Sequence, residues 1–283
     1  MQCEVVAIVP TYNEPDELRR TVSSLLSQGV QGLHVLVVNA GDALPTDIAS
    51  QVEEVTVGAD HYWTHCVQKG FDTVRESDCR YIYLTNADTY AMPGTLEALL
   101  KHAREHSKTV ACAPAYIQEG EDVRLLYSHQ DPMGFLLYGR LIRPWQLPSD
   151  APTDPFEIVL TGGQGVMFPA EVAREFAMDA KRFPHYASDH DLWLTMRKAG
   201  WRLAVLPKTG VVNLRLLSAK QAHGWQKVAR LWWRMTSELT PESWQIMWRL
   251  RRKHLGPVLG LFSAVVSFGL RWTVGLRKIL RRT

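Results

Sequence analysis

The stretch Tyr-Ile-Tyr-Leu-Thr-Asn-Ala-Asp at residues 81–88 decides the fold of this chain. Its first half, residues 81–84, combines aromatic and β-branched residues and predicts a buried strand. Its second half is polar and precedes an amphipathic helix that we expect over about residues 95–106. In open α/β sheets, ligands bind where strands end at their carboxyl side. Asn86 and Asp88 can therefore direct oxygens at one hard cation, or can simply form an Asx turn that starts the helix.

Earlier segments repeat this pattern of an apolar strand followed by polar residues. Residues 5–9, 33–38 and 55–57 are expected strands, and helices are expected from Pro15 and over about residues 63–74. This alternation predicts parallel strands joined by right-handed crossovers, as in nucleotide-binding α/β folds. The chain has neither a Gly-x-Gly-x-x-Gly turn nor a phosphate-binding Gly-x-x-x-x-Gly-Lys loop. A bound nucleotide would therefore be held by side chains and a metal ion.

The polar residues at the strand ends suit a nucleotide base. A uracil or thymine ring presents an N–H between two carbonyls, and an oxygen of Asn39 or Asp42 could accept that proton. Further along, Thr-Gly-Gly-Gln-Gly at residues 161–165 would let backbone approach a ligand, or would form a turn between edge strands. The proline-rich residues 144–155 suggest a lid or binding loop.

Another polar cluster, Ser-Asp-His-Asp at residues 188–191, opens a helix that Gly200 ends. Asp189 there is either a plain N-cap or a functional carboxylate, and Asp191 would also be favoured by the helix dipole. Strands are expected over residues 201–206 and 211–213.

Composition and charge divide the chain near residue 214. The 283 residues suit one large α/β domain, or one domain with an appendage. The N-terminal residues do not resemble a signal peptide, and the four scattered cysteines suggest reduced thiols of a cytosolic protein. Residues 214–283 hold 14 of the 32 Lys and Arg residues but only 2 of the 29 Asp and Glu residues, with six of the ten tryptophans.

This basic tail predicts amphipathic helices, over residues 225–235 and starting at Thr240. Such helices with interfacial tryptophans suit an anionic membrane surface. The uncharged residues 255–270 would reach only about 24 Å as a helix, against a hydrocarbon core of about 30 Å, so we expect them to lie in the interface rather than to span it. The alternative is that the tail covers the first domain or forms a homodimer contact.

Five stretches together resemble glycosyltransferase family 2, the inverting nucleotide-sugar enzymes of GT-A fold. The resemblance covers about residues 4–213, and residues 58–70 resemble the subgroup that includes rhamnosyltransferases. The matching stretches are residues 7–14, 37–42, 83–89, 162–168 and 188–197. The family resemblance implies a GT-A catalytic domain over residues 1–213, with a mostly parallel sheet. It leaves a basic, Trp-rich helical tail over residues 214–283.

The resemblance also implies roles for individual residues. Asp88 and Asn86 match the Asp-x-Asp motif that holds Mg²⁺ or Mn²⁺ on the donor diphosphate, and Asp189 matches the general base, with Asp191 as the fallback. The family's donor-binding positions fall on a larger group of residues. These are Pro10, Thr11, Asn13, Glu14, Asn39, Asp42, Lys69, Asn86 and Ala87.

Several positions depart from the family pattern. Asn86, Ser188 and Asn39 stand where acidic residues are usual, and Asn213 stands where many members have a metal-binding histidine, for which His223 is a candidate substitute. The processive-synthase signature lacks its arginine at residues 221–225, so we expect one sugar to be added per acceptor. A membrane-bound transferase further suggests a lipid-linked acceptor in cell-envelope synthesis, acted on at the cytoplasmic face of the membrane, with no role for nucleic acid.

Three other functions remain open at this stage. A sugar-nucleotide pyrophosphorylase is also α/β with an acidic metal site, although residues 10–13 do not form its Gly-rich loop. The chain could instead be a non-enzymatic nucleic-acid or membrane-surface protein that uses its basic tail. The amides at the motif positions also allow a catalytically inactive transferase relative.

Overall fold

The structure is a computed structural model. It describes residues 3–119, 122–131, 140–214, 225–238, 240 and 243–280. His223 and most of the incomplete synthase signature at residues 221–225 lie outside the described residues.

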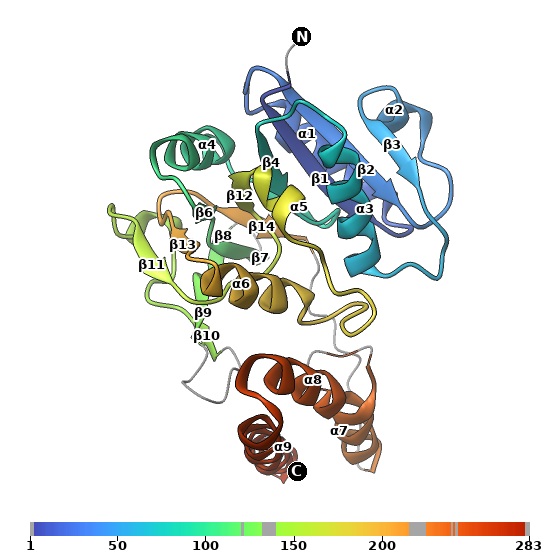
Figure 1. The fold of residues 1–283 in the computed structure, drawn as a ribbon, viewed down its shortest axis with the longest axis vertical. Helices are drawn as coiled ribbons and strands as arrows, with labels where there is room; N and C mark the ends of the chain where they lie inside the picture. The colour runs from blue at the N-terminus through green and yellow to red at the C-terminus, as the bar shows by residue number, and fades with distance from the viewer. Residues whose placement is uncertain are drawn as a thin grey trace.

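A mixed sheet of eight strands forms the centre of the molecule (Figure 1), in the order β11-β13-β6-β12-β4-β1-β2-β3. Strands β4, β1, β2 and β3 run parallel to one another, as do β13 and β6. The antiparallel strand β12 joins these two parallel groups by pairing with β4 on one side and β6 on the other. The strands are β1 (Val5–Thr11), β2 (Leu33–Asn39), β3 (Glu53–Thr56), β4 (Tyr81–Leu84), β6 (Thr109–Cys112), β11 (Phe156–Ile158), β12 (Val166–Pro169) and β13 (Arg202–Val205).

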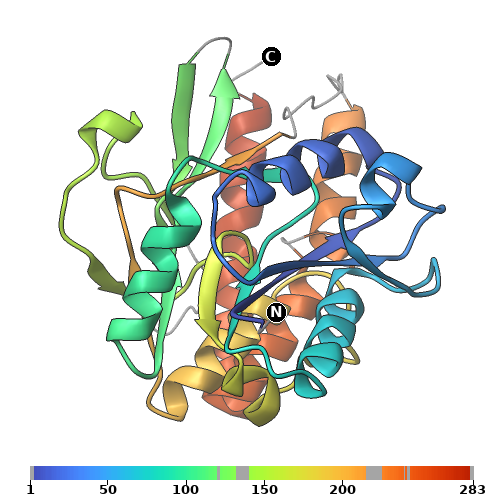
Figure 2. The same ribbon diagram turned by 90° about the horizontal axis from the view of Figure 1, so that it is seen from above.

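Helices cover both faces of this sheet because its strands are apolar on both sides. In β1, Val6 and Ile8 face one core, which α3 and α6 complete, while Val5, Ala7 and Val9 face a second core against α1 and α4. Figure 2 shows these layers from above. The helices of this part are α1 (Pro15–Leu26), α2 (Thr46–Ala49), α3 (Trp63–Arg75), α4 (Thr95–Glu105), α5 (Glu171–Glu175) and α6 (Ser188–Lys198). The predicted α/β fold with a mostly parallel sheet is confirmed.

Smaller sheets lie beside the carboxyl end of β4. One has the order β5-β14-β7-β8, and the other pairs β9 with β10. Their strands are β5 (Thr89–Ala91), β7 (Ala115–Glu119), β8 (Asp122–Tyr127), β9 (His129–Asp131), β10 (Arg140–Ile142) and β14 (Val211–Asn213), with a 3₁₀ helix η2 (Pro148–Asp150) before β11. The glycine run at residues 161–165 leads into β12 inside the main sheet, so it is not a turn between two edge strands.

Three helices form the C-terminal layer, below α6 in Figure 1. They are α7 (Trp225–Thr236), α8 (Trp244–Leu255) and α9 (Pro257–Leu280). The helix expected from Thr240 begins at Trp244, with Ser243 at its N-cap position. Helix α9 has 24 residues and contains a stretch, Pro257–Gly275, long and apolar enough to cross a membrane. This helix is longer than the 16 uncharged residues considered from the sequence, and the expectation that the segment lies in the interface stays a prediction.

Two of the cysteines form a disulfide. Cys3, before β1, bonds to Cys79, before β4, with their Cα atoms 4.7 Å apart. Cys66 and Cys112 are free and buried. The expectation of four reduced thiols is therefore wrong for one pair, because two parallel strands that are neighbours in the sheet bring the preceding residues together.

Candidate active site

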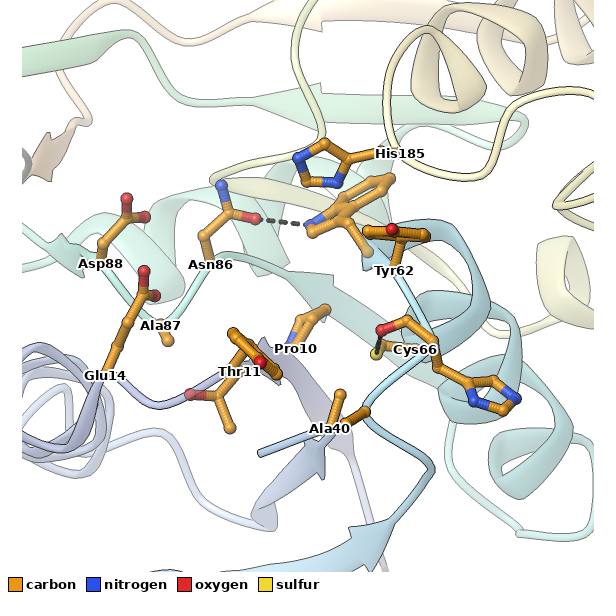
Figure 3. A pocket seen from close by; sticks show the side chains of 14 residues that line it. Pro10, Thr11, Glu14, Ala40, Tyr62, Cys66, Asn86, Ala87, Asp88 and His185 are labelled. Carbon is orange, nitrogen blue, oxygen red and sulfur yellow. Dashed lines mark hydrogen bonds between the residues drawn. The ribbon is translucent and has the colours of Figure 1, made fainter. Parts of the chain in front are cut away.

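A cavity of about 450 Å³ opens at the carboxyl ends of β1, β2 and β4 (Figure 3). This is the edge where a parallel α/β sheet binds ligands. The end of β1 supplies the loop that leads into α1, and the end of β4 supplies residues 86–88. The cavity is lined by Pro10, Thr11, Tyr12, Glu14, Ala40, Ala59, His61, Tyr62, Trp63, Cys66, Asn86, Ala87, Asp88 and His185.

Asp88 is the buried carboxylate of this cavity, with 7 % of its surface exposed. Its Oδ1 accepts a hydrogen bond from Thr89 Oγ1 at 3.1 Å. Burial raises the pKa of Asp88 above its ordinary value, and the negative charge of Glu17 adds to this, while the bond from Thr89 opposes it. In Figure 3 the carboxylate of Glu14 lies on the same side of the cavity. A cation bound here would offset the free-energy cost of ionising the buried Asp88 carboxylate.

Asn86 is held by its neighbours in an orientation that differs from the expected one. Its Oδ1 accepts a hydrogen bond from Trp63 Nε1 at 2.8 Å (Figure 3), and its Nδ2 donates to Gln164 Oε1 at 3.4 Å. Gln164 also accepts from Thr89 Oγ1 at 3.1 Å. Trp63 and Gln164 thus fix the orientation of the Asn86 amide, whose oxygen keeps a second lone pair, and its role as a metal ligand stays a prediction.

Asp189 lies beside the cavity wall, in the first turn of α6. Its Oδ2 accepts from the backbone N–H of Gly163 at 3.1 Å, and its Oδ1 accepts from the N–H of His190 at 2.8 Å. Gly163 itself packs against the indole of Trp63, which lines the cavity. Asp189 is not among the lining residues, so one glycine and one indole lie between it and the space that Asp88 faces.

The charges of both carboxylates act on the buried phenol of Tyr127. Burial raises the pKa of Tyr127, Gln164 opposes this by hydrogen bonding, and the charges of Asp189 and Asp88 both raise it further. Burial lowers the pKa of His185, a half-buried lining residue, while the charge of Asp189 opposes that shift. The neighbours Gly163 and Gln164 connect the two acids, because Gly163 donates to Asp189 and Gln164 binds both Tyr127 and Thr89.

The structure brings together six of the residues expected to bind donor or metal. They are Pro10, Thr11, Glu14, Asn86, Ala87 and Asp88. Four others are placed outside the cavity lining. They are Asn13, Asn39, Asp42 and Lys69.

Each of these four has a physical reason for its position. Asn39 is buried and fully engaged: its Nδ2 donates to Asp42 O and Glu54 Oε1, and its Oδ1 accepts from Gly41 N. Asn13, at φ 54°, uses its Oδ1 to hold the N–H of exposed Asp42 at 2.7 Å. Lys69 lies exposed on α3, whereas its neighbour Gly70 packs on Ile8 of β1. None of the four lines the cavity, and their role as donor contacts stays a prediction.

Asp191, the fallback base, is buried away from the cavity lining. Its two oxygens accept from Lys253 Nζ at 2.7 Å and His254 Nε2 at 2.8 Å, both on α8. Ser188, at the position where an acid is usual, hydrogen bonds through its hydroxyl to Thr64 at 2.7 Å. Both residues connect helices, and the geometry favours Asp189 over Asp191 as the base.

Sequence reasoning missed the aromatic wall of the cavity. Tyr62 and Trp63 precede and start α3, and His185 lies 5.9 Å from the Tyr62 ring. Aromatic residues just before an amphipathic helix were the available signal for the first two. Nothing in the local pattern of residues 183–187 indicated that His185 reaches the cavity, because a loop between distant elements places it there.

Comparison with known proteins decides the family. The family model described as glycosyl transferase family 2 matches residues 6–155, more than half of the chain. The chain belongs to glycosyl transferase family 2. Members of this family use a nucleotide-sugar donor and invert the configuration of the transferred sugar. The pyrophosphorylase alternative is thereby set aside.

A solved structure shares the fold of this family 2 glycosyltransferase. It is the crystal structure of GalNAc-T7 with UDP, GalNAc and Mn²⁺, with a TM-score of 0.62 and 10 % sequence identity. The match covers 83 % of this chain but only 49 % of that one, so the chain spans about half of the other protein's length. The GT-A fold expectation is confirmed. A search of curated proteins found no match.

Proposed function

We propose that this enzyme transfers a single sugar from a nucleoside-diphosphate donor to the hydroxyl group of a membrane-associated acceptor. The observation that carries the proposal is the buried carboxylate of Asp88 in a cavity formed at the carboxyl ends of β1, β2 and β4. A diphosphate binds together with a divalent cation, and a carboxylate such as that of Asp88 can hold this cation.

The residues present fit a divalent cation that binds together with the donor. No group of three or more His, Cys, Asp or Glu side chains that could hold a metal ion occurs among the described residues. Mg²⁺ and Mn²⁺ sites of this kind use one or two carboxylates and take further ligands from substrate phosphates and water. Asp88 would hold the ion, with Glu14 on the same side of the cavity. The ion would supply Lewis-acid stabilisation of the leaving diphosphate.

Asp189 is the proposed general base. Inversion needs a carboxylate that takes the acceptor's proton as its oxygen attacks the sugar carbon opposite the leaving group. The Gly163 N–H and the N–H of His190 hold Asp189 in one orientation beside the cavity wall. A positioned base of this kind contributes about 10²–10⁴ in rate.

The donor base and sugar are narrower proposals. Residues 58–70 resemble rhamnosyltransferases, and five residues of this stretch line the cavity. They are Ala59, His61, Tyr62, Trp63 and Cys66. We propose a uridine or thymidine diphosphate sugar as donor, gripped by this wall rather than by Asn39.

We also propose that residues 214–283 form a membrane-associating unit beside a catalytic domain of residues 1–213. On α9 the side chains of Val258, Leu261, Phe262 and Val265 are exposed at helical spacing. The opposite face, with Ser263, is buried against α8, which carries a run of basic residues. A helix with one side packed on such a partner can lie in an anionic interface but cannot be surrounded by lipid. This favours peripheral attachment at the cytoplasmic face and a lipid-linked acceptor.

The donor proposal is tested with nucleoside diphosphates alone. UDP, dTDP, GDP and ADP are added to the full chain with and without Mn²⁺, and the unfolding temperature is measured. We expect UDP or dTDP to stabilise the protein in a Mn²⁺-dependent way that Asp88→Ala abolishes. No stabilisation by any of the four nucleotides would contradict the proposal. Binding of a nucleotide without release of nucleoside diphosphate from any nucleotide sugar would also contradict it, and would indicate a catalytically inactive transferase relative.

The membrane proposal is tested by flotation with vesicles. The double variant Phe262→Ser/Val265→Ser should lose binding to phosphatidylglycerol-containing vesicles, whereas Leu147→Ser, which removes an exposed leucine from the catalytic domain, should bind normally. Equal binding of both variants would contradict the assignment.

A further inference from the structure

The second acidic residue of α6 is held by the C-terminal helices. Asp191 is 2 % exposed, and its carboxylate accepts from Lys253 Nζ at 2.7 Å and from His254 Nε2 at 2.8 Å. The His254 side chain is itself 4 % exposed. A deeply buried carboxylate is costly to leave without partners, and the two side chains of α8 that bind both of its oxygens fix the position of Asp191.

Helix α8 also contacts the start of the segment formed by residues 179–191, which ends at Asp191. Lys253 Nζ lies 3.3 Å from Asp179 Oδ2, so this one ammonium bridges two acids twelve positions apart in the sequence. Four residues earlier on the helix, Arg249 Nη1 donates to the carbonyl of Arg182 at 3.2 Å. The charged face of α8 therefore holds the segment at its start and at its end.

An apolar contact holds the middle of the segment. Ile246 and Leu250 of α8 form a buried cluster with Phe183, against which Tyr186 and Leu194 pack. Ile246, Leu250 and His254 follow one another at intervals of four, so they lie on one side of α8. Helix α8 thus contacts residues 179–191 at the start, in the middle and at the end.

This segment carries two residues of the active site. His185 lines the cavity, and Asp189 lies two positions before Asp191 in the same helical turn. The turn begins at Ala187 with φ 65°, a left-handed conformation that a non-glycine residue adopts only when its surroundings impose it. The surroundings that impose it here include α8, because Ala187 packs against the apolar cluster of Phe183, Ile246 and Leu250.

We propose that Lys253 and His254 are positioning residues for sugar transfer: by holding Asp191, they fix the first turn of α6 and with it the carboxylate of Asp189. The C-terminal unit is then part of the catalytic apparatus and not only a means of attachment. This inference rests on the proposed role of Asp189 as base. The donor side of the cavity is built on β1, β2 and β4, which α8 does not hold, so nucleotide binding should be independent of this contact.

The test compares two neighbouring charge deletions on α8. Lys253→Met removes the bridge, whereas Arg252→Met removes an exposed cation whose guanidinium lies over Trp248. Release of nucleoside diphosphate from UDP- and dTDP-sugars gives kcat and KM, and UDP affinity in Mn²⁺ is measured separately. We expect kcat of Lys253→Met to fall about 10- to 100-fold, as small misplacements of catalytic groups do, with UDP affinity within about twofold of wild type.

Two further measurements separate positioning from loss of structure. Lys253→Arg should recover most of kcat because it keeps a cation at the bridge. Amide hydrogen exchange in residues 187–194 should rise in Lys253→Met and not in Arg252→Met. Unchanged kcat in Lys253→Met, or a fall matched by an equal loss of UDP affinity, would overturn the positioning role. A wild-type protein that turns over no donor would overturn the proposed function itself, which is a distinguishable result.

Discussion

Gly163 provides a sharp test of how the cavity wall and the base are connected. A Cβ added at this position would lie 2.5 Å and 2.7 Å from two carbons of the Trp63 indole, and 3.6 Å from Asp189 Cβ. Carbon atoms pack at about 3.5–4.0 Å, so the ring would have to move by about 1 Å. Its backbone φ is not in the left-handed region, so the clash, and not strain, is the expected effect of Gly163→Ala.

Moving the indole disturbs the side chain that is hydrogen-bonded to it. The Trp63 Nε1 bond to Asn86 Oδ1, now 2.8 Å, would lengthen beyond hydrogen-bonding distance. Overpacking costs about 1–3 kcal/mol and the lost bond about 1 kcal/mol, which corresponds to roughly 4–16 °C in the unfolding temperature of a domain this large. A 1 Å displacement at a catalytic site can also lower turnover by about 10²-fold.

The assay is nucleoside diphosphate release together with thermal unfolding. The control is Gly269→Ala in α9, where an added Cβ meets nothing within 4 Å. It should leave turnover unchanged and stabilise the protein by up to about 1 kcal/mol, since alanine favours a helix. Wild-type turnover in Gly163→Ala would refute the connection between Trp63, Gly163 and Asp189.

Two other predictions concern the buried carboxylate and the disulfide. Because burial raises the pKa of Asp88, its protonation stabilises the metal-free fold as pH falls, whereas cation binding needs the carboxylate. The Mn²⁺-dependent shift in unfolding temperature should therefore vanish on acidification at a pH above the usual range for aspartate, and Asp88→Asn should show no such shift at any pH. Thiol titration of the denatured, unreduced protein should find two thiols, Cys66 and Cys112, and reduction of Cys3–Cys79 should lower stability by up to about 4 kcal/mol for a loop of this length. Four thiols before reduction would contradict the pairing.

Local sequence patterns predicted the elements on which the site is built. Residues 81–84 form β4 with the bounds expected, and Asp88 follows it at the edge of the sheet. These features depend on the alternation of apolar strands with helices, on prolines that end strands or start helices, and on polar residues that follow strand ends. All of these are visible in short stretches of sequence. Thr11 and Glu14, which the family resemblance assigned to donor binding, line the same cavity as Asp88.

Features that depend on distant contacts could not be predicted in this way. Asn39 resembles a base-binding residue in sequence, but Glu54 on the neighbouring strand takes its amide. Asp191 resembles a catalytic acid, but residues more than sixty positions later occupy both of its oxygens. The residue type showed that each side chain would form polar contacts, whereas the tertiary structure decided which group it contacts.

The most direct measurement of the central claim is turnover by Asp189→Asn beside its binding of UDP in Mn²⁺. The account predicts that binding stays within about twofold while turnover falls by about 10²–10⁴, the contribution of a positioned base. Turnover close to wild type in Asp189→Asn would contradict the assignment of this carboxylate, and with it the division of labour between Asp88 in the cavity and Asp189 beside its wall.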